Sequence, residues 1–384
     1  MKLKGLFLSV YITLSLLMFA TFKVSIWVWT SFFISSLILF IITIYHLYYE
    51  KNYSPFLSAY IVFSFLFLLA APISQINSFY GIENPKFVNF FPFKEKIIIY
   101  TNFIICVFNL IFILSYIYFK KNLKQFNSRR NFTIDQKHLP FTILIILGMS
   151  IVVFFISIEF IQNEFARPSW VASSSSVAKL LIWKKFLLLI PFAGILLCFQ
   201  YFKKNKKKRD NLINIIFFLS IFFILLIWFK NPFTEKRNAL GPIYLSILFL
   251  VIPKLFNSNL KTLSFLFFVM IILFPLSAIV THSDATFLEI YHNPMILIKQ
   301  MKGGGVSDAF NTLNYDAFGN IMATIDYVHK YGFSYGYQLL GAILFFIPRT
   351  IWPSKPYSTG QVIGEHLIND FGFNFSNLSN PLIS

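Results

Sequence analysis

Three arginines stand in short polar segments between long apolar runs: Arg167, Arg237 and Arg349. Arginine keeps its charge at physiological pH, and its planar fork of N–H donors fits two phosphate oxygens at once. Three such forks that converge from different segments would suit a pyrophosphate. The alternative for each residue is an anchor, in which the guanidinium reaches the lipid headgroups at a helix end. Arg349 is the strongest candidate, because prolines fix its backbone and Trp352 could pack beside it.

The segment around Arg349 combines two cations, a tryptophan and several prolines. It runs from Ile347 to Pro356 and follows the apolar run Leu339–Ile347, which is too short to span a bilayer. Each proline removes a backbone donor, so an ordinary spanning helix would not end in this way. A cation at the edge of the hydrocarbon is costly unless it has a partner or faces water. The segment therefore predicts an anionic ligand or water beside Arg349.

Asp316 and a pair of lysines are further candidates for chemistry. Asp316 lies on the polar side of a predicted amphipathic helix, where its carboxylate could act as a general base on a sugar hydroxyl or hold an arginine in place. The alternative for Asp316 is an ordinary hydrated helix face. Lys184 and Lys185 interrupt the start of an apolar run. They either flank a helix that starts at Phe186 or lie on the rim of an anionic site.

Motifs for metals and cofactors are sparse in this sequence. One loose group of metal-type side chains consists of His282, Asp284, Glu289 and His292. Glu289 and His292 have the spacing of ligands carried by one helix. His282 and Asp284, however, lie at the end of a predicted span, where capping and interface roles are common. The sequence has no Gly-rich phosphate loop, no paired CxxC and no GxSxG elbow. We therefore expect no metal site and no cofactor.

The composition places the elements that carry these residues in a membrane. Of the 384 residues, 57% are hydrophobic and 12% are charged, whereas soluble domains average about 25% charged residues. The net charge of +18 gathers in short loops between apolar runs, as topology signals do. This placement argues against a nucleic-acid partner, which a basic face or stripe would indicate. The chain is predicted to be an all-α polytopic membrane protein.

Several apolar runs have the length of about 20 residues that a membrane-spanning helix needs. They are Gly5–Phe22, Val24–Tyr45, Phe56–Ile76, Ile97–Phe119, Leu139–Ile158, Leu180–Phe202, Leu212–Phe229, Ala239–Phe256 and Thr262–Thr281. We therefore expect residues 1–281 to form a transmembrane bundle, in a protein of about 9–10 membrane helices. Alternate loops carry about twice as many Lys and Arg residues as the loops between them, which places the N-terminus in the cytoplasm.

Residues 282–384 are predicted to form a large external loop. The run Gly303–Gly305 is a candidate hinge. From Asp308 to Lys330, apolar residues recur every three or four positions, which predicts an amphipathic helix that lies on the membrane surface or caps the bundle. Leu339–Ile347 would then dip toward the membrane as a short re-entrant or interfacial piece.

Short motifs in this region resemble the bacterial oligosaccharide repeat-unit polymerases, the O-antigen and capsular polysaccharide polymerases of the inner membrane. The motifs are Asp316-Ala317-Phe318-Gly319-Asn320, Tyr331-Gly332, Gln338-Leu339-Leu340 and Pro348-Arg349-Thr350-Ile351-Trp352-Pro353-Ser354-Lys355-Pro356. They cover residues 300–360, and the preceding helices match the family in number and hydropathy. The resemblance implies the multi-helix fold of membrane glycosyltransferases that use polyprenyl phosphates and no metal.

The resemblance also implies an activity and residue roles. Family members transfer a growing glycan from undecaprenyl diphosphate to the non-reducing end of a new lipid-linked repeat unit, at the external face of the inner membrane. External arginines are thought to grip the donor diphosphate, a role that would fall on Arg349, Arg237 and Arg167. Lys355 would assist, and Asp316 would be the acid–base or arginine-orienting residue. The implied partners are undecaprenyl-diphosphate-linked glycans, membrane lipids and a chain-length regulator protein.

The sequence departs from the family in one respect and leaves two other functions open. Family members continue into further spanning helices, whereas this chain stops at Ser384, which predicts truncation at the C-terminus. The other functions are a flippase for lipid-linked oligosaccharides and an O-antigen ligase. Transporters usually show internal repeats and polar residues near the membrane midplane. Because the predicted spans here are nearly free of ionisable residues, we favour chemistry at the membrane surface.

Overall fold

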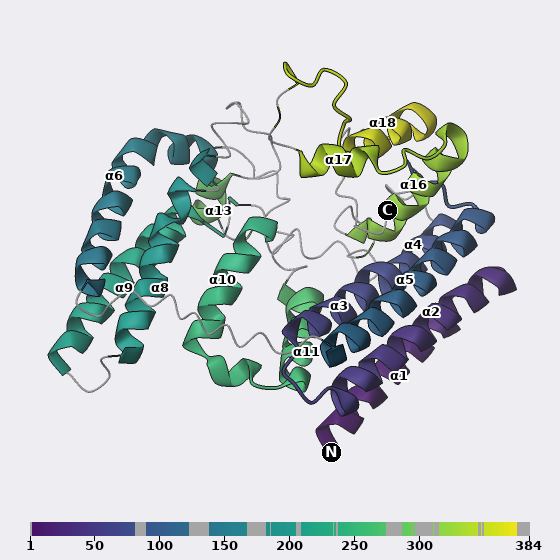
Figure 1. Cartoon of the computed structure of the whole chain (residues 1–384), viewed down its shortest axis with the longest axis horizontal. Helices are drawn as coiled ribbons and strands as arrows, with labels where there is room; N and C mark the ends of the chain where they lie inside the picture. Colours follow the sequence, from purple (N-terminus) through teal and green to yellow (C-terminus); the bar gives the residue numbers. More distant parts are fainter. Residues whose placement is uncertain are drawn as a thin grey trace. The chain divides into compact units, whose positions relative to one another are not determined.

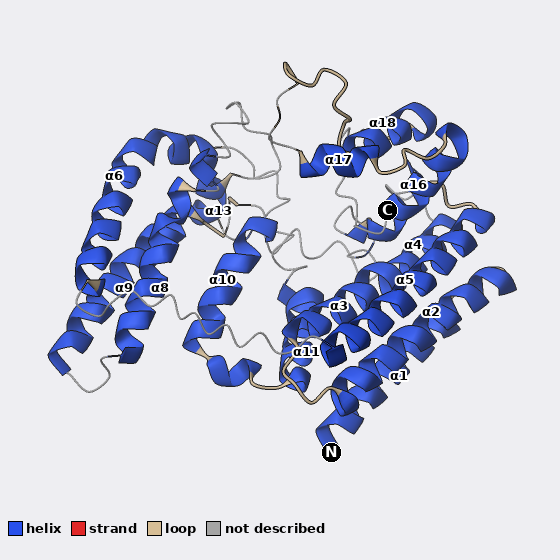
Figure 2. Ribbon diagram, viewed as in Figure 1, coloured by secondary structure: helices blue, strands red, loops and turns tan. Residues whose placement is uncertain are grey.

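Helices are the only regular elements in the part of the chain that this computed structural model describes (Figure 2). The described residues are 2–80, 90–122, 138–166, 182–184, 186–204, 209–232, 234–235, 237–273, 286–293, 295, 310, 315–344, 347 and 349–374. The prediction of an all-α polytopic membrane protein is confirmed, because several of these helices are long and apolar enough to cross a bilayer.

Six helices among the described residues can span a membrane by length and composition. They are Lys2–Ala20, Ile26–Tyr49, Pro55–Tyr80, Glu95–Asn122, Leu139–Phe165 and Ile182–Lys203. Each corresponds to one of the first six predicted spans. The last three predicted spans correspond to shorter apolar helices. These helices are Ile213–Phe229, Ala239–Val251 and Asn259–Leu273.

One of the short helices has a clear physical cause for its early end. The predicted span Ala239–Phe256 stops being α-helical at Val251, and a 3-10 turn, Pro253–Phe256, follows it. Pro253 lacks the backbone N–H that the next helical hydrogen bond needs, and its ring disfavours helical geometry in the residue before it. The end of the last predicted span, from residue 274 to 281, lies outside the described residues.

Two compact units make up the chain. The first contains residues Met1–Phe126, Ser258–Phe267 and Gly304–Ser384, and the second contains Asn127–Asn257 and Phe268–Gly303. The predicted boundary at residue 281 separates a bundle from an external region, whereas these units combine parts of both.

The first unit contains a helical bundle and three helices from the C-terminal region (Figure 1). The bundle consists of α1 (Lys2–Ala20), α2 (Ile26–Ile44), α3 (Pro55–Phe65), α4 (Ala71–Tyr80), α5 (Glu95–Asn122) and α11 (Asn259–Phe268). The π turns Tyr45–Tyr49 and Leu66–Ala70 extend α2 and join α3 to α4. The C-terminal helices are α16 (Ala317–Tyr331), α17 (Tyr337–Ile343) and α18 (Thr359–Phe371).

Helix α16 carries the candidate residues of this region into the core of the first unit. It packs against α5, α18 and the π turn before α4. Phe318 is fully buried, and its ring centre lies 5.5 Å from that of Phe32 on α2. Asn320 is also fully buried. The side of the helix that carries Asn320 is therefore not a hydrated face, because tertiary packing covers it.

The predicted start of this helix at Asp308 differs from the observed start at Ala317. Gln75 on α4 donates hydrogen bonds to the backbone carbonyls of Phe310 and Tyr315, over 2.9 and 3.0 Å. These carbonyls are therefore satisfied by a side chain from another helix. A periodic pattern in the sequence does not reveal such a long-range partner.

The second unit is a group of helices in which close packing depends on a glycine. Its helices are α6 (Leu139–Phe165), α8 (Ile190–Lys204), α9 (Arg209–Phe229), α10 (Arg237–Val251) and α13 (Phe287–His292). Helix α8 packs against α6 and α9. At Gly194, a Cβ atom would lie 2.4 Å from the ring of Phe222 on α9. Small residues at such crossings let membrane helices approach closely.

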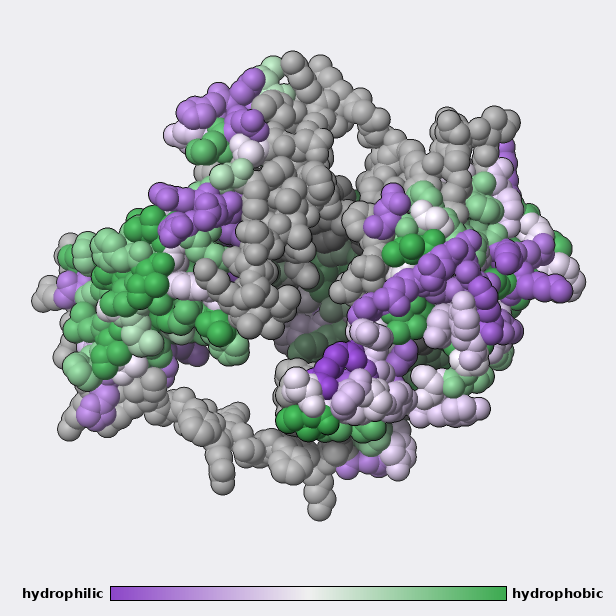
Figure 3. All heavy atoms as spheres, turned by 90° about the horizontal axis from the view of Figure 1, so that it is seen from above, coloured by the Kyte–Doolittle hydropathy of each residue, from purple (hydrophilic) through white to green (hydrophobic). Residues whose placement is uncertain are grey.

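Large apolar side chains lie on the outside of the candidate spans, and Figure 3 shows many hydrophobic residues on one surface of the molecule. Leu16, Phe155 and Ile224 are examples with most of their side chains exposed. A soluble protein rarely exposes apolar patches of this kind, whereas a bilayer covers them with lipid tails. The exposed surface is therefore that of a multi-pass membrane protein.

Candidate functional site

Arg349 lies in a tight loop that follows α17. Its guanidinium donates hydrogen bonds to the backbone carbonyls of Lys355 and Pro356. The same group lies over the ring of Tyr357, with the guanidinium carbon 4.3 Å from the ring centre. These contacts fix the direction of an exposed side chain, and a guanidinium with two N–H groups engaged has further donors for a ligand.

The positive charge of Arg349 is not neutralised within the described part of the protein. Its partners there are two carbonyl oxygens and the face of Tyr357. Such groups orient and stabilise a cation, but they carry no full negative charge. An anion beside Arg349 stays a prediction, and in the described chain no carboxylate competes with it for the guanidinium.

The remaining side chains of the loop hold it together. Lys355 donates from Nζ to the carbonyl of Ile347 over 2.9 Å, so part of its donor capacity serves the loop itself. The Tyr337 hydroxyl donates to the carbonyl of Ser354 over 2.6 Å. Trp352 packs edge-on against Tyr337, with ring centres 6.1 Å apart. The aromatic ring beside Arg349 is thus Tyr357, and Trp352 braces the loop from α17.

Helix α17 presents apolar side chains on its surface directly before the Arg349 loop. Leu339, Leu340 and Ile343 are all exposed. The helix has 7 residues, which at about 1.5 Å per residue gives roughly 10 Å and cannot cross a bilayer. An exposed apolar helix of this length is typical of the membrane interface.

Asp316 lies at the N-cap position of α16, with a partly buried carboxyl group. Burial raises the pKa of this carboxyl to about 7, although a hydrogen bond with Asn320 opposes the shift. An acid with that pKa exchanges its proton near neutral pH, as a general base must. None of the described arginine side chains contacts Asp316. The predicted role of Asp316 in orienting an arginine therefore has no support in the described residues.

The side chains of the other two predicted arginines lie outside the part of the chain that the structure describes. Arg237 is the first residue of α10 in the second unit, and its side chain lies outside the described part of the chain. Arg167 follows Ala166 at the C-terminal end of α6 and also lies outside it. The predicted convergence of three arginines therefore remains a prediction.

The second unit contains a buried network of two lysines and two glutamates. Lys184 pairs with Glu164 and Glu235 at 2.6 and 2.7 Å, and Lys230 pairs with Glu235 at 3.1 Å. Lys230 also donates to the carbonyl of Lys184 over 2.7 Å. Burial raises the pKa of Glu235, but the two lysines outweigh it and the net pKa is lowered. Lys184 thus has carboxylate partners inside the protein.

Of the four metal-type residues predicted together, Glu289 has a capping role. Its carboxylate accepts a hydrogen bond from the backbone N–H of Thr286 over 2.7 Å, and the Thr286 hydroxyl accepts one from the N–H of Glu289. This reciprocal capping box starts α13. His282 and Asp284 lie outside the described residues. Lys185, which was predicted together with Lys184, also lies outside them.

A pocket opens between α16, α17 and α18 in the first unit. Its volume is about 160 Å³. Hydroxyl, amide and aromatic side chains line much of it, including Thr324, Tyr327, Tyr331, Gln338 and Thr359. Tyr331 and Gln338 belong to two of the short motifs that carry the family resemblance, so this pocket connects segments that are separate in the sequence.

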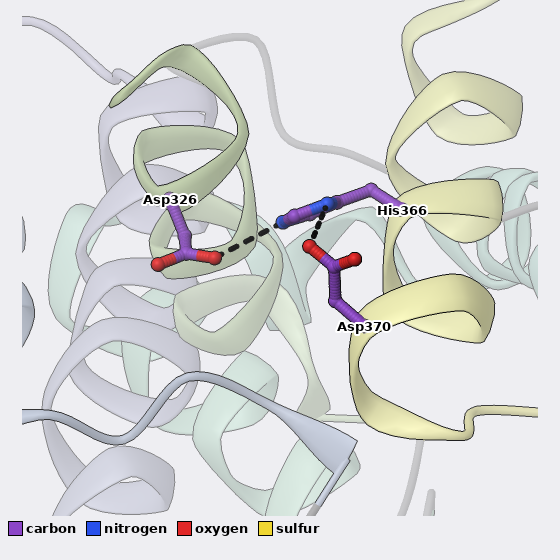
Figure 4. A group of neighbouring side chains, drawn as sticks. All are labelled: Asp326, His366 and Asp370. Carbon is purple, nitrogen blue, oxygen red and sulfur yellow. Dashed lines mark hydrogen bonds and ion pairs between the residues drawn. The ribbon is translucent and has the colours of Figure 1, made fainter. Parts of the chain in front are cut away.

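A buried histidine joins α16 to α18 behind this pocket (Figure 4). The Nε2 atom of His366 lies 3.1 Å from Oδ2 of Asp326, and its Nδ1 atom lies 3.1 Å from Oδ2 of Asp370. Lys330 donates to both carboxylate oxygens of Asp370, which lowers the pKa of that carboxyl. The rings of Tyr327 and of the imidazole are 5.6 Å apart.

Asp326, His366 and Asp370 are also the residues most suited to hold a metal ion in the described chain. Their ligand atoms lie within 4.8 Å of one another. The two carboxylates approach opposite nitrogens of the imidazole ring, as Figure 4 shows, and an ammonium group already occupies Asp370. This geometry fits a hydrogen-bonded ion network that fixes two helices better than ligands that converge on one point.

Sequence reasoning missed both buried networks and the pocket. His366 and Asp326 are 40 positions apart, and Lys184 and Lys230 are 46 apart. Two pairs are local in the sequence: His366 and Asp370 lie one helical turn apart on α18, and Lys230 and Glu235 lie five positions apart.

Comparisons with protein-family models, curated proteins and solved structures find no match to this chain. The functional argument therefore rests on the residues themselves. Its components are the Arg349 loop, Asp316 with its raised pKa, and the pocket between α16, α17 and α18.

Proposed function

We propose that this protein polymerises lipid-linked oligosaccharide repeat units at the external face of a bacterial inner membrane. It would transfer the growing glycan from undecaprenyl diphosphate to the non-reducing end of a new lipid-linked repeat unit. The observation that carries the proposal is the oriented and exposed guanidinium of Arg349, which follows a short helix with exposed apolar side chains. A lipid diphosphate is an anion that lies at the membrane interface while its apolar chain stays in the bilayer.

The chemistry needs charge stabilisation more than a strong nucleophile. A hydroxyl oxygen of the acceptor sugar attacks the anomeric carbon of the donor, and the bond from that carbon to the diphosphate oxygen breaks. Negative charge then builds up on the departing diphosphate, where a fixed cation stabilises it. Arg349 can offer two parallel donors to the phosphate oxygens, and Lys355 and the other predicted arginines, Arg237 and Arg167, would add charge.

Asp316 is the proposed acceptor of the proton that the sugar hydroxyl loses. A pKa of about 7 leaves roughly half of the carboxyl groups ionised at neutral pH. Its raised pKa also makes the carboxylate a better base than an ordinary aspartate. Because the donor already carries a good leaving group, positioning of the acceptor hydroxyl contributes much of the remaining rate.

The proposal is tested by the surface glycan of the native host after deletion of the gene. Loss of a polymerase leaves single repeat units on the lipid anchor, which a gel separates from the polymer ladder. Complementation with Arg349→Lys should shorten the ladder strongly, because the charge remains while the planar fork is lost. Asp316→Asn should reduce polymer at equal protein level.

Lys254→Ala is the matched control, because Lys254 is an exposed cation in a loop that the charge pattern places in the cytoplasm. This variant should give a wild-type ladder. A wild-type ladder from Arg349→Lys or from the deletion strain would contradict the proposed function.

A flippase for the same lipid-linked glycans is the second candidate. Polar residues buried within candidate spans favour it, among them His46, Asn102 and Asn109, because such residues often line transport paths. His46 bonds to Ser58, and Asn109 accepts from Tyr60, so these groups already have partners within the helices. A deletion strain with no repeat unit on the external face would favour the flippase. A deletion strain with full-length free polymer that is not joined to its final acceptor would favour the ligase.

A further inference from the structure

The walls of the pocket between α16, α17 and α18 define the chemistry of a ligand. Ten of the residues that the structure describes line it, and none of these ten is a lysine, arginine, aspartate or glutamate. A site without charge does not compensate the desolvation of a phosphate, a metal ion or a carboxylate. Its ligand should therefore be neutral.

The pocket nevertheless offers several polar groups. Thr359 on α18 donates its hydroxyl to Oε1 of Gln338 on α17 over 3.3 Å. This bond orients the Gln338 amide with its oxygen toward Thr359. The N–H groups of the amide can then donate to a ligand. Thr324 and Ser334 add hydroxyl groups to the lining. Such a lining suits a ligand that carries several hydroxyl groups.

Aromatic faces form another part of the wall. The rings of Tyr327 and Tyr331 lie 4.7 Å apart at a tilt, and Tyr331 is largely exposed on the pocket rim. Phe333 also lines the pocket with an exposed ring. An aromatic face packs well against the C–H face of a sugar ring, which leaves the hydroxyl groups at the ring edge for the polar side chains.

The turn between α16 and α17 holds these groups in place. Gly332 and Gly336 have φ values of 84° and 82°, and Tyr335 has a φ of 47°. Three residues in the left-handed region make a tight turn that few other sequences adopt. Behind the wall, His366 packs against Tyr327 and Tyr331 and bonds to Asp326. The pocket is therefore supported by contacts that do not depend on a ligand.

The volume limits the size of the ligand. Pockets for drug-sized ligands have about 300–1,000 Å³, whereas this one has about 160 Å³. That space takes one small ring with its substituents.

We propose that this pocket binds a single neutral sugar ring, a hexose or an N-acetylhexosamine. Tyr331 packs on the face of the ring, and Gln338 and Thr359 bond to its hydroxyl or acetamido groups. The proposal rests on the proposed function for its biological ligand, which would be a sugar of the incoming repeat unit. The pocket thereby defines a selectivity for neutral over acidic sugars at this position.

The test measures binding of simple sugars to the purified full chain in detergent. The probes are the methyl glycosides of glucose, galactose, N-acetylglucosamine and glucuronic acid, observed by saturation-transfer difference NMR. We expect at least one neutral glycoside to bind and the glucuronide to bind more weakly. Gln338→Leu and Tyr331→Ala should each raise the Kd at least tenfold. Asn369→Ala is the matched control, because Asn369 is exposed on α18 and does not line the pocket.

Thermal unfolding of each variant establishes that loss of binding is not loss of fold. Thr359→Val provides a second test at constant shape, and it should weaken binding of the same glycoside. The proposal is overturned if no neutral glycoside binds the wild-type protein, or if binding survives in the folded Gln338→Leu and Tyr331→Ala variants.

The surface glycan separates this proposal from the proposed function. If sugar binding depends on the pocket but the ladders of the deletion strain and of Arg349→Lys are normal, the sugar pocket stands and the polymerase proposal fails. If Arg349→Lys shortens the ladder while the wild-type protein binds no glycoside, the polymerase proposal stands and the pocket proposal fails.

Discussion

Asp316 holds its proton to a higher pH than an aspartate in water, because burial disfavours the ionised form. Arg349 shows the opposite situation, since it stays charged and exposed and its partners orient the guanidinium without neutralising it. In both cases the residue type is ordinary, and the neighbours determine what it can do. The same holds for Lys230, a buried cation that is stabilised by Glu235 and by the carbonyl of Lys184.

The first prediction concerns the pH dependence of stability. The folded pKa of Asp316, about 7, is above its usual 3.8, so the folded protein binds more protons than the unfolded chain between those values. The contribution of Asp316 to stability is therefore largest at acidic pH and falls as the pH rises to about 7. Asp316→Asn, which mimics the neutral acid, should raise stability at pH 8 by up to about 4 kcal/mol and leave it nearly unchanged at pH 4.

Thermal unfolding in detergent at both pH values checks this prediction. Asp370→Asn is the control of opposite sign, because Lys330 lowers the pKa of Asp370. The ionised carboxylate of Asp370 therefore contributes to stability at pH values above the usual pKa of an aspartate. That variant should lose a little stability at pH 8. An Asp316→Asn protein that melts like wild type at pH 8 would show that the carboxyl is not desolvated.

The second prediction concerns the buried ion network of the second unit. Lys230→Met removes one partner and leaves Glu235 with Lys184 alone, which should cost about 3–5 kcal/mol. Adding Glu235→Leu removes the carboxylate that has lost one of its two cations, and it leaves the pair of Lys184 and Glu164 intact. The double variant should therefore unfold at a higher temperature than Lys230→Met. A double variant that is less stable than the single one would mean that the network itself supplies net stability.

At the scale of elements, two features determine the architecture around the candidate site: the short length of α17 and the close approach of the Arg349 loop to it. Helix α17 is too short to span and leaves its apolar side chains exposed. Gly341 on that helix lets Pro356 of the Arg349 loop approach, since a Cβ atom would lie 2.5 Å from the proline ring. The loop can therefore fold back on α17 only with glycine at this position.

The third prediction compares two glycines within membrane helices. Gly194→Ala would place a methyl group against the ring of Phe222 and should destabilise the packing of α8 on α9 by about 1–3 kcal/mol. Gly148→Ala on α6 meets no atom within 4 Å and should be neutral or stabilising by about 0.5–1 kcal/mol, because alanine favours helix. Unfolding temperatures of the purified variants distinguish the two. Equal effects would contradict the observed contact.

At the scale of the whole molecule, the proposed function makes a prediction about membrane topology. The structure shows six helices able to span, together with three shorter apolar helices, in the described residues. The charge pattern predicts that the N-terminus lies in the cytoplasm. The proposed function requires the Arg349 loop on the external face, where the lipid-linked repeat unit is presented.

The fourth prediction tests this orientation. In a chain with Cys106→Ser and Cys198→Ala, Tyr335→Cys should react with a membrane-impermeant maleimide in intact cells, because Tyr335 is highly exposed and predicted to be external. Lys254→Cys should react only after the cells are permeabilised. The reverse labelling pattern would place the candidate site in the cytoplasm and contradict the proposed function.

Helices with continuous apolar runs could be predicted from the sequence, because a bilayer requires about 20 apolar residues whatever the neighbours are. The first six spans illustrate this, with ends that differ by a few residues. The helix predicted over residues 239–256 is shorter in the structure. Hydropathy alone suggests one continuous helix there, but Pro253 interrupts it. The start of α16 was wrong by several residues, because the preceding carbonyls bond to Gln75 from another helix.

The sequence by itself determined the all-α membrane class and the unusual character of the segment around Arg349, because both depend on composition and local order. Only the tertiary structure decided that Arg349 is oriented by carbonyls and by Tyr357, that Asn320 is buried, and that His366 fixes α16 to α18 beside a neutral pocket. Those properties arise from contacts between residues far apart in the chain. No local pattern encodes which of the many possible partners a folded chain brings together.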